Sequence, residues 1–224
     1  MQDTDPVRSA AARWGLVVPV KRLVLAKTRL GRPYGPYLDD VRQELALAFA
    51  SDVVTAALRC PSVGVVVVVT DDPLAAATLQ SLGAQVVADT PDAGHNAALE
   101  HGAALARSRY QAAGVATLSA DLPCLTAEAL TAALRQVGAT SRAFAPDATG
   151  TGTTLLAAGA DAALAAAYGP GSAERHRLSG AVPLDVAAGL RLDVDTAEDL
   201  VRARALGVGA ATAAVLTGLA GRVA

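Results

Sequence analysis

Short valine-rich runs alternate along most of the chain with longer segments in which apolar residues recur every three or four positions. The clearest run, residues 63–69, is almost pure valine, which is typical of a strand covered on both faces. The preceding segment, residues 39–60, has the apolar spacing of a helix. We therefore predict an α/β, Rossmann-like fold with a mostly parallel central sheet flanked by helices. In such folds, ligands bind beyond the carboxyl ends of the strands.

The remaining elements follow the same alternation. Strands are expected at residues 16–20, 63–69, 85–88, 115–118, 142–145 and 153–157, with short strands near Val182 and Leu190. Helices are expected at residues 39–60, 73–82, 96–113 and 126–137, then just after Ser172 and from Thr196. No repeat or linker interrupts this order, so we predict one domain over residues 13–224, preceded by a disordered arm at residues 1–12.

Composition and charge argue against several classes of protein. The 224 residues carry 19 Lys and Arg against 21 Asp and Glu, a net charge of −2 that is unlike a nucleic-acid binder. No stretch has the roughly 18 strongly apolar residues of a membrane-spanning helix, and no secretory signal is visible. Cys60 and Cys124 lie far apart, which argues against a zinc site or a disulfide framework. We expect a cytoplasmic protein that binds neither membranes nor nucleic acid.

The loop after the first expected strand is rich in positive charge. It contains Lys21, Arg22, Lys27 and Arg29, four cations within nine residues. Such a cluster could neutralise a nucleotide triphosphate, and a solvated basic turn is an equally supported alternative. The chain has neither the GxxxxGK(S/T) pattern of a P-loop nor the GxGxxG pattern of a dinucleotide-binding domain.

Carboxylates follow two other expected strands. Asp121 stands after residues 115–118, where it could hold a divalent cation or simply belong to the turn that leads into a helix. Asp193 and Asp195 alternate along an extended segment, which would present both carboxylates on one side. Asp195 or Thr196 could also cap the next helix, and capping is compatible with metal binding. Two acidic strand ends favour metal-assisted phosphoryl transfer.

Two segments have the composition of a small-anion site. Residues 147–154 combine glycines with four threonines, including Thr153 and Thr154, although a plain hairpin turn would look similar. In residues 168–176, Ser172 is expected to cap a helix, with free backbone amides beside Arg175 and His176. Such a helix start suits a phosphate or a carboxylate.

The segment that opens the helix at residues 96–113 offers less. Asn96 could cap that helix or read the edge of a nucleotide base, and capping is the simpler explanation. His95 and His101 are off a common helical face, which argues against a metal pair. The chain has no GxSxG elbow, and neither cysteine has a histidine nearby in the sequence, so hydrolysis by a nucleophilic side chain has no support.

Taken together, five stretches resemble the phosphoenolpyruvate or 2-phospho-lactate guanylyltransferase family of coenzyme F-420 biosynthesis. They are VPVKRLVLAKTRL, SADLPCL, DATGTGTT, YGPGSAERH and LDVDT, in the family's order from Leu16 to about Leu206. The resemblance implies a GT-A-like nucleotidyltransferase fold and transfer of GMP from GTP to a small phospho-acid, with release of pyrophosphate. Many archaeal members read GTN where this chain has Gly152-Thr153-Thr154.

The resemblance also implies roles for particular residues. Lys21, Lys27 and Arg29 would hold the GTP phosphates, Asp121 and Asp195 would ligate Mg²⁺ with Asp193 alongside, and Asn96 would read guanine. Thr153, Gly169 and Ser172 would bind the acceptor acid, with Thr154, Arg175 and His176 beside them. The alanine- and valine-rich composition indicates a GC-rich genome such as that of an actinobacterium, and phosphoenolpyruvate is the expected acceptor in such members.

Several alternatives stay open at this point. The acceptor could be 2-phospho-L-lactate, 3-phosphoglycerate or another small phosphorylated compound; a molybdopterin or sugar-phosphate acceptor is disfavoured by the compact Ser172 segment. A glycosyltransferase is disfavoured because its DxD motif should lie mid-chain. A non-catalytic GTP-binding regulatory domain is disfavoured because it would not need the acidic residues at two expected strand ends. A homodimer and transient contact with the next, deazaflavin-modifying transferase are further expectations.

Overall fold

Seven strands form a single sheet in the computed structural model, which describes residues 13–25, 30, 38–90, 92–138 and 140–223. The strands are β1 (Trp14–Pro19), β2 (Val63–Val69), β3 (Gln85–Val87), β4 (Gly114–Leu118), β5 (Arg142–Pro146), β6 (Thr153–Ala158) and β7 (Val182–Pro183). Their order across the sheet is β3-β2-β1-β4-β6-β5-β7. The predicted arm at residues 1–12, Lys27 and Arg29 lie outside the described residues.

The sheet is mostly parallel, as predicted. β3, β2, β1 and β4 run parallel to one another, and β7 runs parallel to β5. β6 is antiparallel to both of its neighbours, β4 and β5. The amino end of β6 therefore lies at the same edge of the sheet as the carboxyl ends of β1, β4 and β5. The predicted pairing of residues 142–145 with 153–157 is confirmed.

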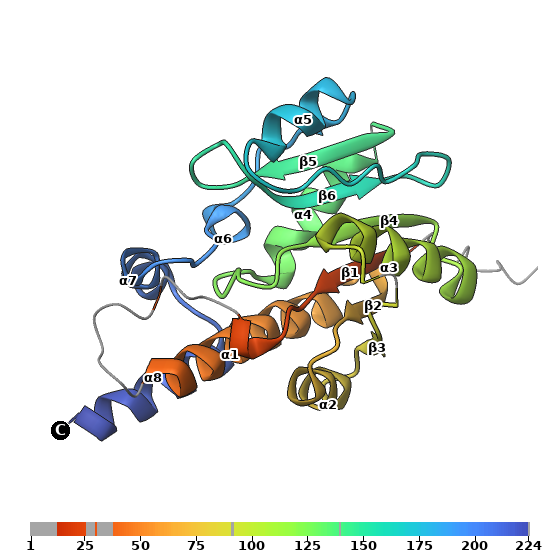
Figure 1. The fold of residues 1–224 in the computed structure, drawn as a ribbon. Coiled ribbons are helices and arrows are strands. Elements are labelled where there is room, and N and C mark those ends of the chain that lie inside the picture. The colour runs from red at the N-terminus through yellow and green to blue at the C-terminus, as the bar shows by residue number, and fades with distance from the viewer. Residues whose placement is uncertain (1–12, 26–29, 31–37, 91, 139, 224) are drawn as a thin grey trace, which may run out of the picture.

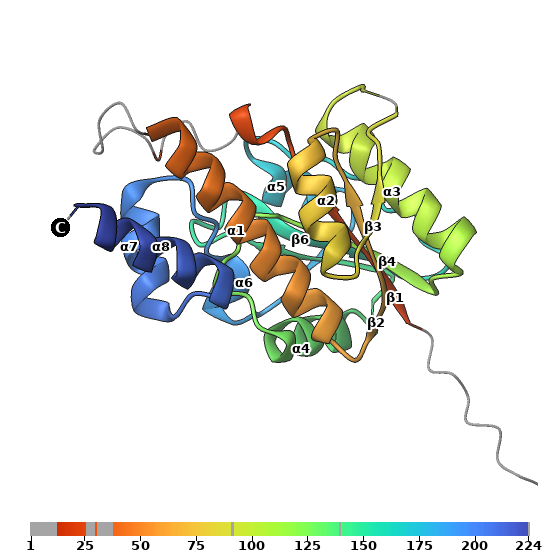
Figure 2. The same cartoon turned by 90° about the horizontal axis from the view of Figure 1, so that it is seen from below.

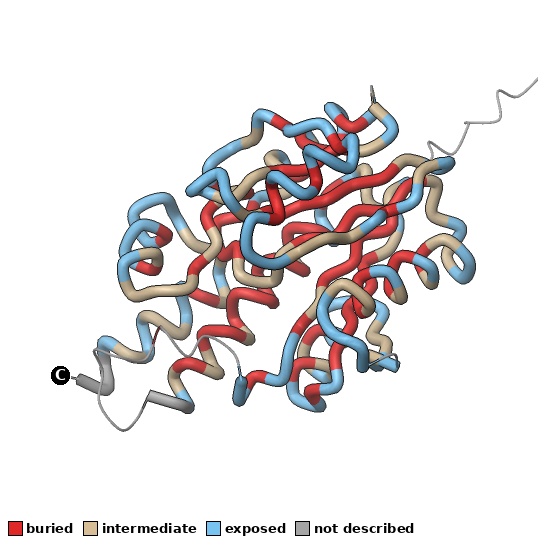
Figure 3. Tube along the Cα trace, turned by 45° about the horizontal axis from the view of Figure 1, so that its top comes forward, coloured by how far each residue is buried: buried red, intermediate tan, exposed pale blue. Residues whose placement is uncertain are grey.

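Helices cover both faces of the sheet (Figures 1 and 2). On one face lie α1 (Leu38–Arg59), α2 (Pro73–Ser81) and α4 (Ala127–Val137), and on the other lie α3 (His95–Tyr110) and α5 (Ser172–Leu178). Alternation along β1 explains this division, because Leu16 and Val18 pack toward α1 whereas Val17 packs toward α3. The buried residues concentrate along the strands and the inner faces of the helices (Figure 3).

The last third of the chain differs from the prediction in two places. Leu190 lies in a short helix, α6 (Ala188–Arg191), and not in a strand. The helix predicted from Thr196 is two helices, α7 (Ala197–Leu206) and α8 (Ala210–Val223), which meet at 116°. Gly207, with a φ of 101°, ends α7. The buried carboxylate of Asp52 on α1 then accepts hydrogen bonds from the Ala211 and Thr212 amides, which fixes the start of α8.

Within the described residues, no single helix is both long and apolar enough to span a membrane. The pair α7 and α8 reaches the length and hydropathy of a span only when the two bent halves are counted together.

Candidate active site

A cavity of about 780 Å³, here called the main cavity, lies where β1, β4 and β5 end and β6 begins. Seven of the residues predicted from the sequence line it: Lys21, Asp121, Thr153, Gly169, Ser172, Asp193 and Asp195. They come from segments as far apart in the chain as residues 21 and 195. The structure therefore brings the predicted nucleotide, metal and acceptor residues to one place.

The loop that carries Lys21 is held by two buried side chains. A short 3-10 helix, η1 (Leu23–Leu25), follows Lys21. The carboxylate of Asp72, which also caps α2, accepts the Leu23 amide at 2.9 Å. The guanidinium of Arg42 on α1 donates to the Val24 carbonyl at 3.0 Å. These contacts orient the loop so that Lys21 reaches the main cavity.

Acidic side chains also line the main cavity. The Val194 amide donates to the Asp121 carbonyl at 3.0 Å, which joins the loop after β4 to the segment that carries Asp193 and Asp195. Burial, and then the charge of Asp121, raise the pKa of Asp193 to about 6, with Asp195 and Asp147 adding to the effect. Asp147, which follows β5, also lines the cavity. The cluster is therefore a region of strong negative potential.

Capping of α7 is performed by Thr196, one of the two residues considered from the sequence. Its hydroxyl accepts the Asp199 amide, and the Asp199 carboxylate accepts the amides of Asp195 and Thr196 in a capping box. Asp195 is therefore not the capping side chain, and it lines the main cavity.

The acidic cluster fits a divalent cation that is completed by its substrate. Among the described residues, no three Asp, Glu, His or Cys side chains form a ready-made metal cage, so the predicted trio Asp121, Asp193 and Asp195 is not a closed set of ligands. Mg²⁺ in phosphoryl-transfer sites is typically held by one or two carboxylates together with substrate phosphates and water. The oxygen donors and the mutual repulsion of these carboxylates match that kind of site.

Removing the Asp193 charge should stabilise the metal-free protein. Because the pKa of Asp193 is raised in the folded protein, ionisation of its carboxyl group destabilises the fold. This destabilisation is absent below about pH 4 and fully present above about pH 6. We expect Asp193→Asn to raise the free energy of unfolding at pH 7.5 by about 1 kcal/mol, less than the full pKa shift implies because the side chain is partly exposed. Thermal unfolding at pH 7.5 and pH 5, with and without Mg²⁺, measures this. If Asp193→Asn is less stable than the parent at pH 7.5 without metal, the claim that burial and neighbouring carboxylates destabilise ionised Asp193 is wrong.

Thr153, another lining residue of the main cavity, is held by His176. His176 is fully buried, and its Nδ1 lies 2.9 Å from the Thr153 hydroxyl while its Nε2 accepts the Ala167 amide at 3.1 Å. Burial, aided by the charges of Arg142 and Arg175, lowers the pKa of His176 to about 4. His176 is therefore neutral with its proton on Nδ1, and it donates to Thr153. It positions the predicted acceptor-binding hydroxyl and does not itself line the cavity.

The start of α5 differs from the expectation. Gly171, with a φ of 72°, is the capping residue, and Ser172 is the first residue of the helix. The amides of Ser172 and Ala173 are not free, because they donate to the carbonyls of Gly169 and Thr151. Any contact that Ser172 makes with an acceptor would therefore come from its side chain, which is almost fully buried at the cavity wall.

Three other predicted residues, Thr154, Arg175 and Asn96, do not line the main cavity. Strand alternation turns Thr154 away from Thr153, and the Thr154 hydroxyl donates to the Leu190 carbonyl at 2.6 Å. The guanidinium of Arg175 donates to the carbonyls of Ala167 and Pro170. Asn96 does not cap α3, whose capping residue is Gly94, and its amide group instead contacts the main chain of Tyr168.

Five polar lining residues were given no individual role from the sequence: His95, Ser119, Asp147, Thr151 and Tyr168. His95 opens α3, with its ring edge against Tyr168 at a centroid distance of 5.4 Å. Burial, and then the charge of Lys21, lower its pKa, although Asp121 and Asp89 act in the opposite direction. Placement after a strand could have indicated Asp147, whereas only the tertiary fold brings His95 to this cavity.

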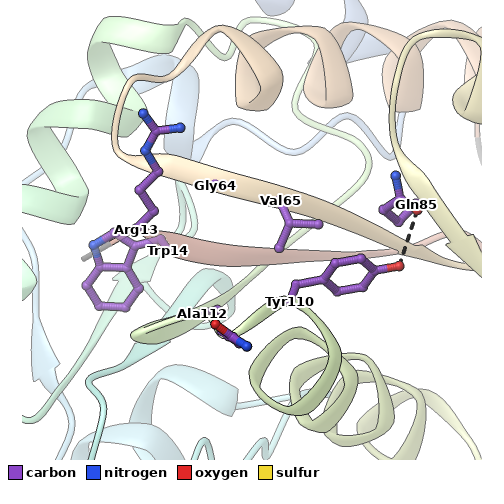
Figure 4. Close-up of a pocket in the computed structure, with 8 residues that line it drawn as sticks. Arg13, Trp14, Gly64, Val65, Gln85, Tyr110 and Ala112 are labelled. Atoms are coloured by element: carbon purple, nitrogen blue, oxygen red, sulfur yellow. Dashed lines mark hydrogen bonds between the residues drawn. The ribbon is translucent and has the colours of Figure 1, made fainter. Parts of the chain in front are cut away.

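A second cavity, of about 370 Å³, lies at the amino ends of β1 to β3. Its walls include Arg13, Trp14, Gln85 and Tyr110, and the Tyr110 hydroxyl donates to the Gln85 side chain (Figure 4). No carboxylate lines it within the described residues. Its chemistry is therefore unlike that of the main cavity.

Comparison with known proteins agrees with this geometry. A nucleotidyl transferase from Methanothermobacter has a similar fold, with a TM-score of 0.52 and 19% identity over 86% of this chain and 96% of that one. This likeness is one of fold, and the family model and relatives that follow show an enzyme of the nucleotidyltransferase class. The family model "Guanylyl transferase CofC like" matches residues 15–220, and the chain belongs to that family.

Two relatives lie closer in sequence. The phosphoenolpyruvate guanylyltransferase of Geodermatophilus obscurus is 55% identical over 94% of this chain and 97% of its own length. The protein of the same name from Thermomonospora curvata is 51% identical over 92% of this chain and 90% of its own.

Proposed function

We propose that this protein transfers GMP from GTP to phosphoenolpyruvate, releasing pyrophosphate, as a step in coenzyme F-420 biosynthesis. One observation supports this above all: Lys21, the carboxylates of Asp121, Asp193 and Asp195, and the acceptor candidates Thr153 and Ser172 all line a single cavity. The names of the relatives that align over most of the chain supply the nucleotide and the acceptor.

In this proposal, Lys21 neutralises charge on the triphosphate, and Lys27 and Arg29 act with it. The acceptor phosphate attacks the α-phosphorus of GTP through one of its oxygens. The bond from the α-phosphorus to the bridging oxygen then breaks, and pyrophosphate leaves with the bonding electrons. The acceptor phosphate is already an anion, so no residue needs to remove a proton. The protein acts by bringing two anions together and compensating their charge.

Asp121 and Asp195, with Asp193 beside them, would hold the Mg²⁺ ion. When bound, the ion supplies positive charge to the α-phosphate and to the departing pyrophosphate. Without the ion, the carboxylates would repel the triphosphate and weaken the binding of GTP. With the ion, the same carboxylates would favour binding of the GTP–metal complex. The negative potential around Asp193 supports this assignment.

The acceptor would bind between the Thr153 hydroxyl, the Gly169 main chain and the Ser172 side chain. Thr153 is oriented by a neutral histidine, which keeps the hydroxyl hydrogen available for an anionic oxygen because His176 donates to the hydroxyl oxygen. Arg175 and His176 support this site by fixing the loop in front of α5. Thr154 supports it from the other face of β6.

The wider expectations belong to the same proposal. We infer a cytoplasmic protein of one domain over residues 13–224 that binds neither nucleic acid nor membranes. A homodimer and a hand-over of the labile product to the next transferase are also proposed. A sedimentation experiment tests the first of these two, and protection of the product by the added transferase tests the second.

The fate of labelled phosphate tests the reaction class. With phosphoenolpyruvate and Mg²⁺ present, we expect label at the α-phosphate of GTP to enter an organic product and label at the γ-phosphate to leave in pyrophosphate. Release of γ-label as inorganic phosphate, or of α-label as free GMP in fresh reactions, would indicate hydrolysis and contradict the proposal. Inorganic pyrophosphatase must be absent, because it would convert the labelled pyrophosphate into inorganic phosphate.

A further inference from the structure

One face of α3 holds the segment that leads into the acceptor site. Asn96, Glu100 and Arg107 are spaced by four and seven residues, so their side chains share that face. Arg107 donates to the carbonyls of Gly159 and Ala162 at 3.0 and 2.7 Å. Glu100 accepts the Ala166 amide at 2.7 Å, and Asn96 contacts Tyr168. Helix side chains thus bind main-chain groups along residues 159–168.

The Asn96 contact is the most specific of the three. Its Oδ1 accepts the Tyr168 amide at 2.8 Å, and its Nδ2 donates to the Tyr168 carbonyl at 3.2 Å. Asn96 therefore completes both main-chain hydrogen bonds of a single loop residue, as a neighbouring strand would. Few side chains other than asparagine can present a donor and an acceptor in this way at this length.

Tyr168 carries that restraint into the cavity. Its hydroxyl lies 2.7 Å from the Thr117 hydroxyl on β4, and Tyr168 lines the main cavity. The ring makes T-shaped contacts with the rings of His95 and His176, with centroid distances of 5.4 and 5.2 Å. Gly169 and Ser172, the proposed acceptor contacts, follow directly in the chain. A shift of Tyr168 would therefore displace the acceptor site.

We propose that Asn96 is a positioning residue for the acceptor: it fixes Tyr168, and so the residues from Gly169 to Ser172, relative to α3. This inference rests on the proposed function only for the identity of the acceptor. It is an alternative to the expectation that Asn96 reads guanine, because both polar atoms of its side chain contact Tyr168. Reading a base would have to use the second hydrogen of Nδ2 or the second lone pair of Oδ1, or break one of these hydrogen bonds.

Two variants of Asn96 separate these roles. Asn96→Asp keeps the acceptor for the Tyr168 amide but places a carboxylate oxygen against the Tyr168 carbonyl, and Asn96→Ala removes both bonds. We expect each to raise the KM for phosphoenolpyruvate about tenfold, the effect of losing one or two neutral hydrogen bonds, while the KM for GTP changes less than about twofold. Amide hydrogen exchange in residues 166–172 should accelerate about tenfold. Ser108→Ala, which removes a hydroxyl bond within α3, is the control.

The opposite pattern would overturn the proposal. If Asn96 reads the base, the KM for GTP rises, discrimination against ATP falls, and both the acceptor KM and the exchange rates stay at parental values. The exchange measurement also needs no substrate. If the parent protein turned over none of the acids, the proposed function would fail, and accelerated exchange in the Asn96 variants would still support the positioning role, whereas unchanged exchange would overturn it.

Discussion

Asp121→Asn and Asp195→Asn should each lower the rate of GMP transfer by about a thousandfold or more at saturating substrates, while the protein stays folded. Each substitution removes a negative charge but almost no volume. The proposed metal would lose a ligand at the point where charge develops on the α-phosphate. Initial rates of pyrophosphate release, measured across a range of Mg²⁺ concentrations, give the result, and thermal unfolding confirms that the variants are folded.

Asp185→Asn is the matched control, because Asp185 is exposed and lies outside the main cavity. It should retain the parental rate. Near-normal transfer by Asp121→Asn or Asp195→Asn at every Mg²⁺ concentration, low as well as saturating, would contradict the metal assignment. If the rate falls at low Mg²⁺ and returns at high Mg²⁺, the carboxylate contributes affinity for the metal and little else.

Gly189→Ala should destabilise the fold by about 3 kcal/mol, the upper part of the range for overpacked sites. A Cβ atom at Gly189 would lie 2.2 Å from the main-chain oxygen of Cys124. Main chain cannot move aside as a flexible side chain can, so α6 or the loop after β4 must shift. That loop carries Asp121, so we also expect activity to fall. Denaturant unfolding measures the change in stability.

Gly218→Ala is the matched control in a helix. A Cβ atom there would meet no atom within 4 Å, so the change should raise the free energy of unfolding by about 0.5–1 kcal/mol through lower flexibility of the unfolded chain. Equal effects of the two substitutions would show that glycine flexibility, and not the contact with Cys124, determines the importance of Gly189.

Much of the fold could be predicted because local patterns were strong. Valine-rich residues 63–69 form β2 at the predicted bounds, and the Asp72–Pro73 start of α2 follows ordinary capping chemistry. The segments of Lys21 and Asp121 could be predicted for a related reason. They follow β1 and β4, and the carboxyl ends of parallel strands share one edge of a sheet. Asp193 follows the helix α6 and not the strand that was expected there, and the hydrogen bond from the Val194 amide to the Asp121 carbonyl joins its segment to the same cavity.

The remaining features depend on contacts between distant segments. Leu190 begins the alternating run Leu-Arg-Leu-Asp-Val, which is typical of a strand. The helix α6 forms there instead, and its groups bond to β6 and to Asp147. The amides at the start of α5 have partners in the loops around Gly169 and Thr151, which a local capping rule cannot foresee. Asn96 has the composition of a cap or a base reader, and only the fold brings Tyr168 to it.

Pyrophosphate release with Mg²⁺ and GTP, compared across phosphoenolpyruvate, 2-phospho-L-lactate and 3-phosphoglycerate, tests the central claim most directly. The next transferase and its deazaflavin acceptor should be present to trap a labile product. We expect release with phosphoenolpyruvate at a rate at least about tenfold above the other two acids, a difference of about 1.4 kcal/mol in transition-state binding. Preferential release with either of the other acids, or none with all three despite measurable GTP binding, would contradict the claim.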